Sequence, residues 1–251
     1  MTDEPRPPDS PFWVEPDAVE GETLRLSPEE SHHLLRVFRA APGAPFEAVD
    51  GRGRSYQCVL LSAGRSGAVG RVVACREEAG ELVAPLRVVT GMPSPAAAEE
   101  LVGRAVPLGA TQVVFYPAER AERWGATPAR LARFGRIARA ALKQCRRSRL
   151  PSIQFTETAS EAIAAAPAGA RYLADANGRP WSENASPGVS EGVALAVGPP
   201  GGLTGAERAL FESAGYIRIS LGPSRLTTQD AVSALLCLAR ERILASGPRR
   251  D

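Results

Sequence analysis

Residues 193–238 read VALAVGPPGGLTGAERALFESAGYIRISLGPSRLTTQDAVSALLCL, and this stretch decides the fold. The apolar run 193–197 is typical of a parallel strand that is buried on both faces. Prolines and glycines at 198–202 then interrupt it, and glycine readily adopts the positive φ values that a tight, backbone-lined turn requires. A helix is predicted over 205–214. The order of strand, glycine-rich turn and helix is typical of an α/β sheet.

The second half of this stretch repeats the pattern. Thr204 with Glu207 three residues later predicts a capping box at the helix start, and Gly215 stands where a glycine commonly ends a helix. A strand is then expected over 216–221 and a last helix over 231–244. Because loops at the carboxyl ends of neighbouring strands hold the ligand in open α/β sheets, we predict a pocket between the two loops of this stretch.

The motif VGPPGG, followed about twenty residues later by SLGPSRLTTQDA, resembles the signature of the RsmE family of SPOUT methyltransferases. The family pattern is close to GPEGG, then LGxRILRTETA. The matching positions are Gly198, Pro199, Gly201, Gly202, Leu221, Gly222, Leu226, Thr228 and Ala231. The resemblance implies S-adenosylmethionine (SAM) as cofactor and N3 of a uridine in small-subunit (16S) ribosomal RNA as the methylated atom. It also implies a homodimer and a SPOUT-type parallel sheet with a C-terminal trefoil knot.

The chain departs from the family pattern at several charged positions. Pro200 replaces a glutamate, Ser224 and Thr227 replace two arginines, and Gln229 and Asp230 replace a Glu-Thr pair. The backbone-shaping residues are kept, so a cofactor pocket is better supported than the substrate. Two alternatives stay open: a SAM-binding or RNA-binding homologue that has lost catalysis, and a methyltransferase with a different substrate.

The resemblance also implies which residues contact the cofactor. They are Ala174, Asp175, Val197, Gly198, Pro199, Gly201, Gly202, Ser220, Leu221, Gly222, Pro223, Leu226 and Thr228. Asp175 ends a predicted strand, 171–175, and an alternative is that it only caps the turn that follows. Residues 176–192 are expected to form a loop.

The chemistry suggests two catalytic candidates. Methyl transfer from a sulfonium is a displacement that needs no metal, but the nucleophile must be held in line. Uracil N3 must lose its proton before it can attack. A cation near the uracil oxygens stabilises the resulting anion. The candidates for this role are Arg225 and Arg147, which the family resemblance of residues 129–151 places at the cofactor cleft.

The remainder of the chain predicts two domains after a flexible arm, 1–11. Residues 12–80 are predicted to be mostly β with one short helix opened by Ser27, and the resemblance makes them a PUA-like, RNA-binding β-barrel. Residues 85–251 are the predicted SPOUT methyltransferase domain. Its strands 86–90 and 112–116 flank a helix, 96–108, which is the alternation of a parallel sheet.

Two basic segments are candidates for RNA contact. Arg36 and Arg39 follow the short helix and are either phosphate ligands or ordinary solvated side chains. Residues 129–149 are predicted to form an amphipathic helix with strongly basic outer faces. Like charges at this spacing need a counter-charge, which favours RNA over a solvated face. The RNA-binding residues expected here are Arg139, Lys143, Gln144 and Arg146.

Composition narrows the class of protein. A hydrophobic fraction of 44% excludes wholesale disorder, and the net charge of +2 is unremarkable. The four cysteines have neither zinc-ligand nor disulfide-framework spacing, and the adjacent His32 and His33 point in different directions, so no metal is expected. The N-terminus does not resemble a signal peptide, and no apolar run reaches the ~20 residues of a membrane span. A cytoplasmic protein is expected.

Overall fold

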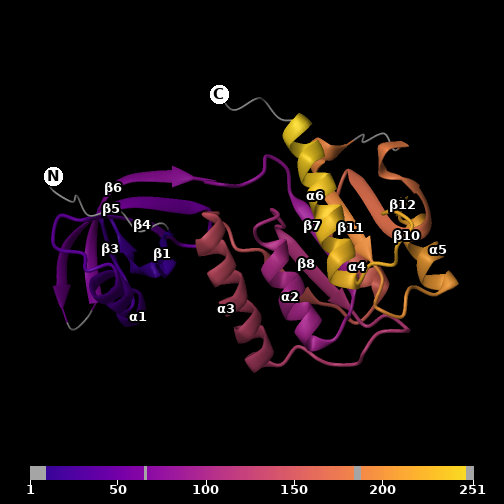
Figure 1. Ribbon diagram of the computed structural model, residues 1–251, viewed down its shortest axis with the longest axis horizontal. Coiled ribbons are helices and arrows are strands. Elements are labelled where there is room, and N and C mark those ends of the chain that lie inside the picture. Colours follow the sequence, from indigo (N-terminus) through magenta and orange to yellow (C-terminus); the bar gives the residue numbers. More distant parts are fainter. Residues whose placement is uncertain (1–9, 65–66, 184–187, 247–251) are drawn as a thin grey trace. The chain divides into compact units, whose positions relative to one another are not determined.

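The computed structural model describes residues 10–64, 67–183 and 188–246. The chain divides into two compact units (Figure 1), one comprising Met1–Glu81 with Arg139–Leu150 and the other Leu82–Ala138 with Pro151–Asp251. Most of the predicted arm, 1–11, lies outside the described residues. Among the described helices, none is both long and apolar enough to cross a membrane.

The first unit is built on a six-stranded sheet in the order β1-β4-β5-β6-β3-β2. Its elements are β1 (Phe12–Trp13), η1 (Pro16–Ala18), β2 (Val19–Glu20), β3 (Thr23–Arg25), α1 (Pro28–His32), η2 (His33–Val37), β4 (Pro45–Val49), β5 (Arg54–Gly64) and β6 (Gly67–Glu77). The sheet encloses one apolar core, to which five strands contribute. Its members include Phe12, Leu24, Phe46, Tyr56 and Ala68. The predicted all-β organisation with one short helix is confirmed.

The short helix changes its winding half-way. Ser27 caps α1 by accepting a hydrogen bond from the Glu30 N–H at 3.2 Å, as its sequence predicts. From His33 onward the turns widen to the π-helix η2, which the sequence does not reveal. The Phe38 N–H donates to the His33 carbonyl oxygen at 3.2 Å, and Arg39 follows in the left-handed region with φ of 53°. The helix therefore ends on a non-glycine residue in a strained conformation.

The second unit is a fully parallel six-stranded sheet in the order β12-β10-β11-β7-β8-β9. Its strands are β7 (Leu86–Gly91), β8 (Gln112–Tyr116), β9 (Ser152–Phe155), β10 (Ala170–Pro180), β11 (Val193–Val197) and β12 (Ile217–Ser220). Its helical elements are α2 (Pro95–Ala105), α4 (Ala159–Ala165), η3 (Trp181–Glu183), η4 (Val189–Glu191), α5 (Gly205–Ser213) and α6 (Thr228–Ser246). The predicted parallel α/β sheet is confirmed.

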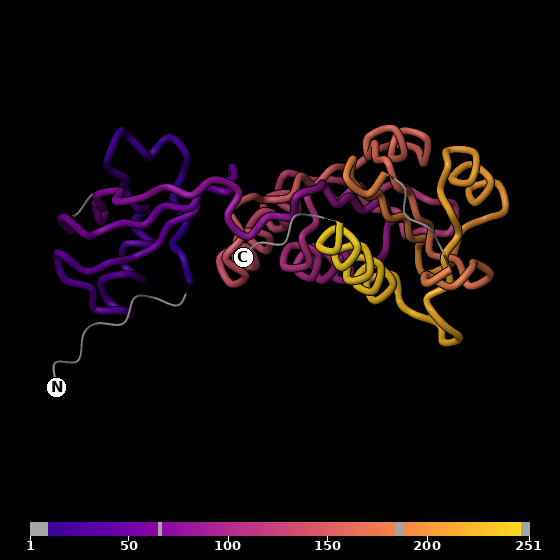
Figure 2. The backbone as a smooth tube through the Cα atoms, turned by 90° about the horizontal axis from the view of Figure 1, so that it is seen from above, coloured from indigo at the N-terminus to yellow at the C-terminus, as the bar shows by residue number. Residues whose placement is uncertain are grey.

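Helices cover this sheet in layers (Figure 2). The helix α6 packs against α2, β7 and β11. The helices α4 and α5 contribute Ala162, Ile163 and Phe211 to an apolar cluster with Val89 and Leu173 of the sheet. The three central strands β11, β7 and β8 are almost wholly buried, because parallel strands with helices on both faces have no solvent-facing side.

The boundaries of most elements match their sequence signals. The capping box at Thr204 forms in both directions, with Glu207 accepting the Thr204 N–H at 2.9 Å. The prediction that 176–192 is all loop is wrong, because β10 continues to Pro180. There Arg179 and Pro180 pair again with β12 after a break in register beyond Ala174.

The basic helix α3 (Pro128–Cys145) ends earlier than the predicted residue 149. Arg146 leaves the helix with φ of 58°, and the chain then runs along the first unit. The Ser148 N–H donates to the Ala79 carbonyl oxygen at 3.0 Å, and the Leu150 N–H donates to the Gly51 carbonyl oxygen at 2.9 Å. These bonds replace the helical ones that the predicted helix would have made.

A buried carboxylate explains why the helix stops. One oxygen of Glu81 accepts Nη2 and Nε of Arg147 at 2.6 and 3.1 Å, and the other accepts the N–H groups of Ser148 and Arg149 at 3.0 and 2.9 Å. The Glu81 and Arg147 side chains are 4% and 3% exposed. A desolvated charge needs such complete pairing, so Glu81 draws residues 147–149 out of the helix.

We expect Glu81→Gln to destabilise the protein by about 3–5 kcal/mol, because it removes the carboxylate charge that compensates the buried Arg147 guanidinium. The free energy of unfolding in denaturant measures this. Glu78→Gln is the matched control, since Glu78 pairs with Arg149 at the surface. Its loss should cost less than about 1 kcal/mol. Equal effects of the two substitutions would contradict the assignment of Glu81 as the anchor.

Candidate functional site

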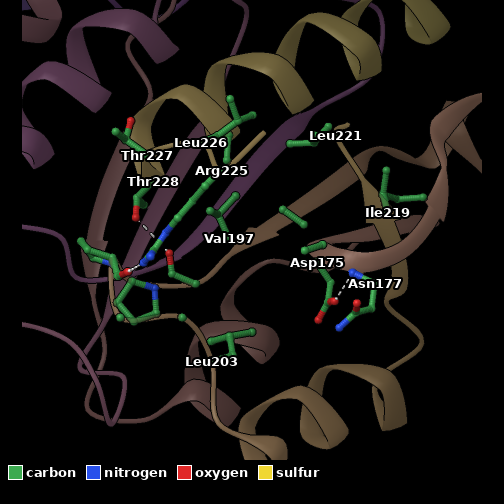
Figure 3. A pocket seen from close by; sticks show the side chains of 18 of the residues that line it. Asp175, Asn177, Val197, Leu203, Ile219, Leu221, Arg225, Leu226, Thr227 and Thr228 are labelled. Atoms are coloured by element: carbon green, nitrogen blue, oxygen red, sulfur yellow. Dashed lines mark hydrogen bonds between the residues drawn. The ribbon is translucent and has the colours of Figure 1, made fainter. Parts of the chain in front are cut away.

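A cavity of about 320 Å³ lies at the carboxyl ends of β10, β11 and β12 (Figure 3). This volume lies within the range of about 300–1,000 Å³ that is usual for small-molecule sites. Its wall combines apolar side chains with the backbone of two glycine-containing loops. The apolar side chains include Val197, Leu203, Ile219, Leu221 and Leu226.

The loop after β11 needs glycine where it approaches another segment. A Cβ atom on Gly201 would lie 2.8 Å from both the carbonyl oxygen and the Cβ of Arg120. Real Cβ atoms do not approach this closely, so a side chain there would push the loop out of place. In the second loop, Gly222 has φ of 112°, a conformation that favours glycine. The matching glycines of the motif therefore shape the cavity.

Two side chains from the second loop hold the first loop in place. The buried Thr228 hydroxyl donates to the Gly198 carbonyl oxygen at 3.1 Å, and Nη2 of Arg225 donates to the Pro200 carbonyl oxygen at 2.9 Å. Figure 3 shows Arg225 and Thr228 reaching toward the first loop from the start of α6. The two loops thus form one connected wall.

Two of the departures from the family pattern form the cap of α6. The Thr227 hydroxyl accepts the Asp230 N–H at 3.2 Å and donates to its carboxylate at 2.6 Å, and Arg104 binds the other carboxylate oxygen at 2.7 Å. The Thr227 hydroxyl and the Arg104 guanidinium hold the pKa of Asp230 below its usual value. This cap explains why α6 begins at Thr228 and not at Ala231 as predicted.

An ion pair forms the opposite side of the cavity. The Asp175 carboxylate accepts Nε of Arg208 at 2.6 Å and the Asn177 N–H at 2.8 Å. Arg208 also donates to the Leu203 carbonyl oxygen at 3.3 Å. Asp175 therefore does what both alternatives proposed: it lines the cavity and it also orders the turn after its strand.

Eleven of the thirteen residues expected at the cofactor line this cavity; Ser220 and Pro223 do not. Alternation along β12 turns Ser220 to the side of the sheet opposite Ile219, which does line it. The lining residues that sequence reasoning missed include Asn177, Leu203, Ile219 and Arg208. The same alternation rule would have found Ile219, whereas Arg208 is an ordinary polar position of α5.

The two catalytic candidates have different surroundings. Arg225 is exposed and lines the cavity. Arg147 is absent from the cavity wall, and its guanidinium is buried on Glu81 in the first unit. The expectation that Arg147 lies at the cofactor cleft is not supported, because its charge is already neutralised by the carboxylate that ends α3.

Three basic side chains of α3 have carboxylate partners within the protein. Arg133 pairs with Glu99, Arg139 with Glu15 at 3.3 Å, and Lys143 with Glu30 at 2.5 Å. Arg139 also stacks over the Trp13 ring at 4.6 Å. These carboxylates supply the counter-charge for which the sequence argument invoked RNA, so that argument no longer supports Arg139 and Lys143 as RNA ligands. Gln144 and Arg146 are exposed.

Arg36 and Arg39 differ from Arg133, Arg139 and Lys143. Both are exposed, and neither forms an ion pair with any residue in the described ranges. Across the same ranges, no group of three His, Cys, Asp or Glu side chains is arranged to hold a metal ion.

The comparison with known families decides the class of protein. A family model described as an RNA methyltransferase domain matches residues 81–240, more than half of the chain. The chain belongs to the RNA methyltransferase family. A second model, described as the PUA domain of RNA methyltransferases, matches residues 26–73 of the six-stranded sheet. The predicted PUA-like domain is thereby confirmed.

Relatives in this RNA methyltransferase family share most of the chain. The protein named ribosomal RNA small subunit methyltransferase E from Mycobacterium bovis is 29% identical over 235 residues, which cover 90% of this chain and 88% of that protein. The protein of the same name from Synechocystis is 27% identical over 241 residues, which cover 89% of this chain and 74% of that protein.

Solved structures of methyltransferases share the fold. A probable rRNA methyltransferase from Porphyromonas gingivalis is 27% identical with a TM-score of 0.79, and the match covers 94% of this chain and 97% of that one. Ribosomal RNA small subunit methyltransferase E from Neisseria gonorrhoeae, bound to SAM, is 22% identical with a TM-score of 0.80 and coverage of 93% and 97%. The predicted SPOUT-type α/β fold is confirmed, whereas the trefoil knot stays a prediction.

We expect Thr228→Val to destabilise the protein by about 1–3 kcal/mol, because it removes the hydroxyl that joins the two loops and leaves the Gly198 carbonyl oxygen without this donor. Thr228→Ser keeps the hydroxyl and is the control. Amide hydrogen exchange of residues 198–203 should accelerate in the valine variant only. Unchanged exchange there would show that the loops do not depend on this bond.

Proposed function

We propose that this chain is a SAM-dependent methyltransferase that modifies N3 of a uridine in small-subunit ribosomal RNA. One observation carries the proposal: in a chain of the RNA methyltransferase family, the two motif loops converge on a cavity at the carboxyl edge of the parallel sheet. Relatives named ribosomal RNA small subunit methyltransferase E support the substrate. The homodimer implied by the family resemblance and the cytoplasmic location of ribosomal RNA belong to the same proposal.

The residues of the cavity fit SAM. Apolar side chains such as Val197, Leu221 and Leu226 suit the adenine ring, and backbone N–H and C=O groups of both loops suit its polar edge. Asp175, Arg208 and Arg225 supply charges of both signs for a ligand that carries an ammonium and a carboxylate. When bound, SAM supplies an electrophilic methyl group on its sulfonium.

Arg225 is the residue placed to assist the nucleophile. Uracil N3 is protonated at neutral pH, and its deprotonation puts negative charge on the two carbonyl oxygens. An exposed guanidinium at the edge of the cavity stabilises that charge when the base enters. Because N3 lies on the pairing edge of the base, the uridine must be unpaired or flipped out of its helix.

The departures from the family pattern do not favour a loss of catalysis. Thr227 and Asp230 form the cap of α6, and the backbone carbonyl of Pro200 accepts the Arg225 guanidinium. Thr227 and Asp230 thus have structural partners at the start of α6, and the backbone at Pro200 is tied to Arg225. A cavity that keeps the motif glycines with an altered charge pattern fits an active enzyme with a locally different pocket.

Calorimetry should detect SAM binding to the wild-type protein, with an affinity at least tenfold weaker in Gly201→Val. The added side chain must displace the loop, because its Cβ meets Arg120. Gly205→Val is the matched control, since a Cβ there has no atom within 4 Å. A wild-type protein that fails to bind SAM would overturn the methyltransferase proposal.

Arg225→Ala should lower the turnover of ribosomal RNA methylation by about 10²–10³-fold, as loss of one anion-stabilising donor does in other enzymes. Mass spectrometry of 3-methyluridine in digested small-subunit RNA measures this. Arg218→Ala, whose guanidinium pairs with Glu212 outside the cavity wall, should retain activity. An Arg225→Ala variant with wild-type turnover would show that Arg225 has no catalytic role. A wild-type protein that binds SAM but forms no product would instead favour a homologue without catalysis.

A further inference from the structure

An exposed aromatic ring projects at the end of the π-helix η2. Phe38 is 40% exposed, and no other Phe, Tyr or Trp is classed as exposed in the ranges that the structure describes. Its ring packs on two others. The ring centroid lies 6.0 Å from that of the buried Phe12, in an edge-on arrangement, and 5.1 Å from that of His33. Packing of this kind fixes the orientation of a ring while leaving part of it open to solvent.

The exposed ring lies in the sequence Arg36-Val37-Phe38-Arg39, between two arginines that form no ion pair with a described residue. Two of the basic side chains expected to contact RNA, Arg139 and Lys143, are by contrast neutralised by carboxylates. Uncompensated cations next to an exposed ring are the combination that proteins use to bind single-stranded nucleic acid.

The backbone gives a third, independent observation. Arg39 has φ of 53°, a left-handed conformation in which glycine is free of the strain that a side chain incurs. The turn is closed around it by the Phe38 N–H to His33 and the Ala40 N–H to Leu34, both at 3.2 Å. A non-glycine residue held in this conformation is a mark of functional sites, and so is a π-helical turn.

We propose that Phe38 is a stacking platform for an unpaired RNA base, with Arg36 and Arg39 holding the phosphates on either side of it. The inference rests on the proposed function, because it assigns the RNA contact of the PUA domain to the segment 36–39. Stacking accepts any base, whereas a paired base is not free to leave its own stack. The platform therefore selects unpaired RNA over duplex and is indifferent to base identity.

Fluorescence polarisation with the full chain and a labelled single-stranded oligouridine tests the platform. Phe38→Leu should weaken binding by at least fivefold, as loss of one stacked base predicts. Phe38→Tyr keeps an aromatic ring and should bind within twofold of the wild type. A perfectly paired RNA duplex of similar length should bind both variants and the wild type equally.

Arg39→Gly gives a second test, because it should raise the stability of the protein and lower its affinity for RNA. Glycine relieves the left-handed strain, so the melting temperature should rise by about 2–4 °C. Loss of one phosphate contact should at the same time weaken RNA binding. The slope of log affinity against log salt concentration should become shallower by about 0.7. Arg39→Lys, which keeps the charge, should retain the slope. Arg71→Gln is the control for loss of charge elsewhere, since Arg71 is exposed on β6 of the same sheet.

The outcomes separate this inference from the proposed function. All variants should bind SAM like the wild type by calorimetry. The stacking platform would be overturned if the Phe38→Leu variant bound single-stranded RNA as tightly as the Phe38→Tyr variant. It would also be overturned if Phe38→Leu lowered the affinity for single-stranded RNA and for duplex RNA equally. An Arg39→Gly variant with unchanged RNA affinity and salt slope would overturn it as well, because the strained arginine would then have no part in binding. A wild-type chain that binds SAM but no RNA would contradict both the platform and the RNA substrate.

Discussion

Parallel pairing of three neighbouring strands determines where this chain can hold a ligand. Because β12, β10 and β11 lie side by side and run in one direction, the loops that follow them all leave the same edge of the sheet. The bond from Thr228 to Gly198 then converts two separate loops into one wall. The position of the cavity and the shape of its wall follow from this arrangement, which explains why the glycines of the motif matter more than its lost charges.

The buried carboxylate of Glu81 has a comparable influence on the first unit. A buried ion pair seldom adds net stability over apolar packing of the same volume, but breaking one is costly. Glu81 satisfies a guanidinium and two backbone N–H groups at once, and no neutral side chain of its size can do so. Glu81 therefore acts mainly by holding residues 146–150 in a non-helical conformation, although their local sequence favours a continued helix.

The range of an interaction along the chain explains what the sequence could predict. The caps at Ser27 and Thr204 act within three residues, so the starts of α1 and α5 were predicted correctly. The end of α3 was not, because it depends on Glu81, which is far away in sequence. The same holds for the carboxylates that neutralise α3. The pocket was largely predictable because a motif names the loops, whereas Arg208 enters it only through the folded position of α5.

The division of the first unit between two stretches of sequence has a consequence for its synthesis. Its sheet is translated by Glu77, but its last segment, Arg139–Leu150, follows only about seventy residues later. At about 5–20 residues per second, a nascent chain spends about 4–14 s with the sheet made and Glu81 without its partners. During this interval the emerging sheet has the Glu81 carboxylate unpaired and Trp13 uncovered. Vectorial folding of this domain therefore waits for the second half of α3 to leave the ribosome.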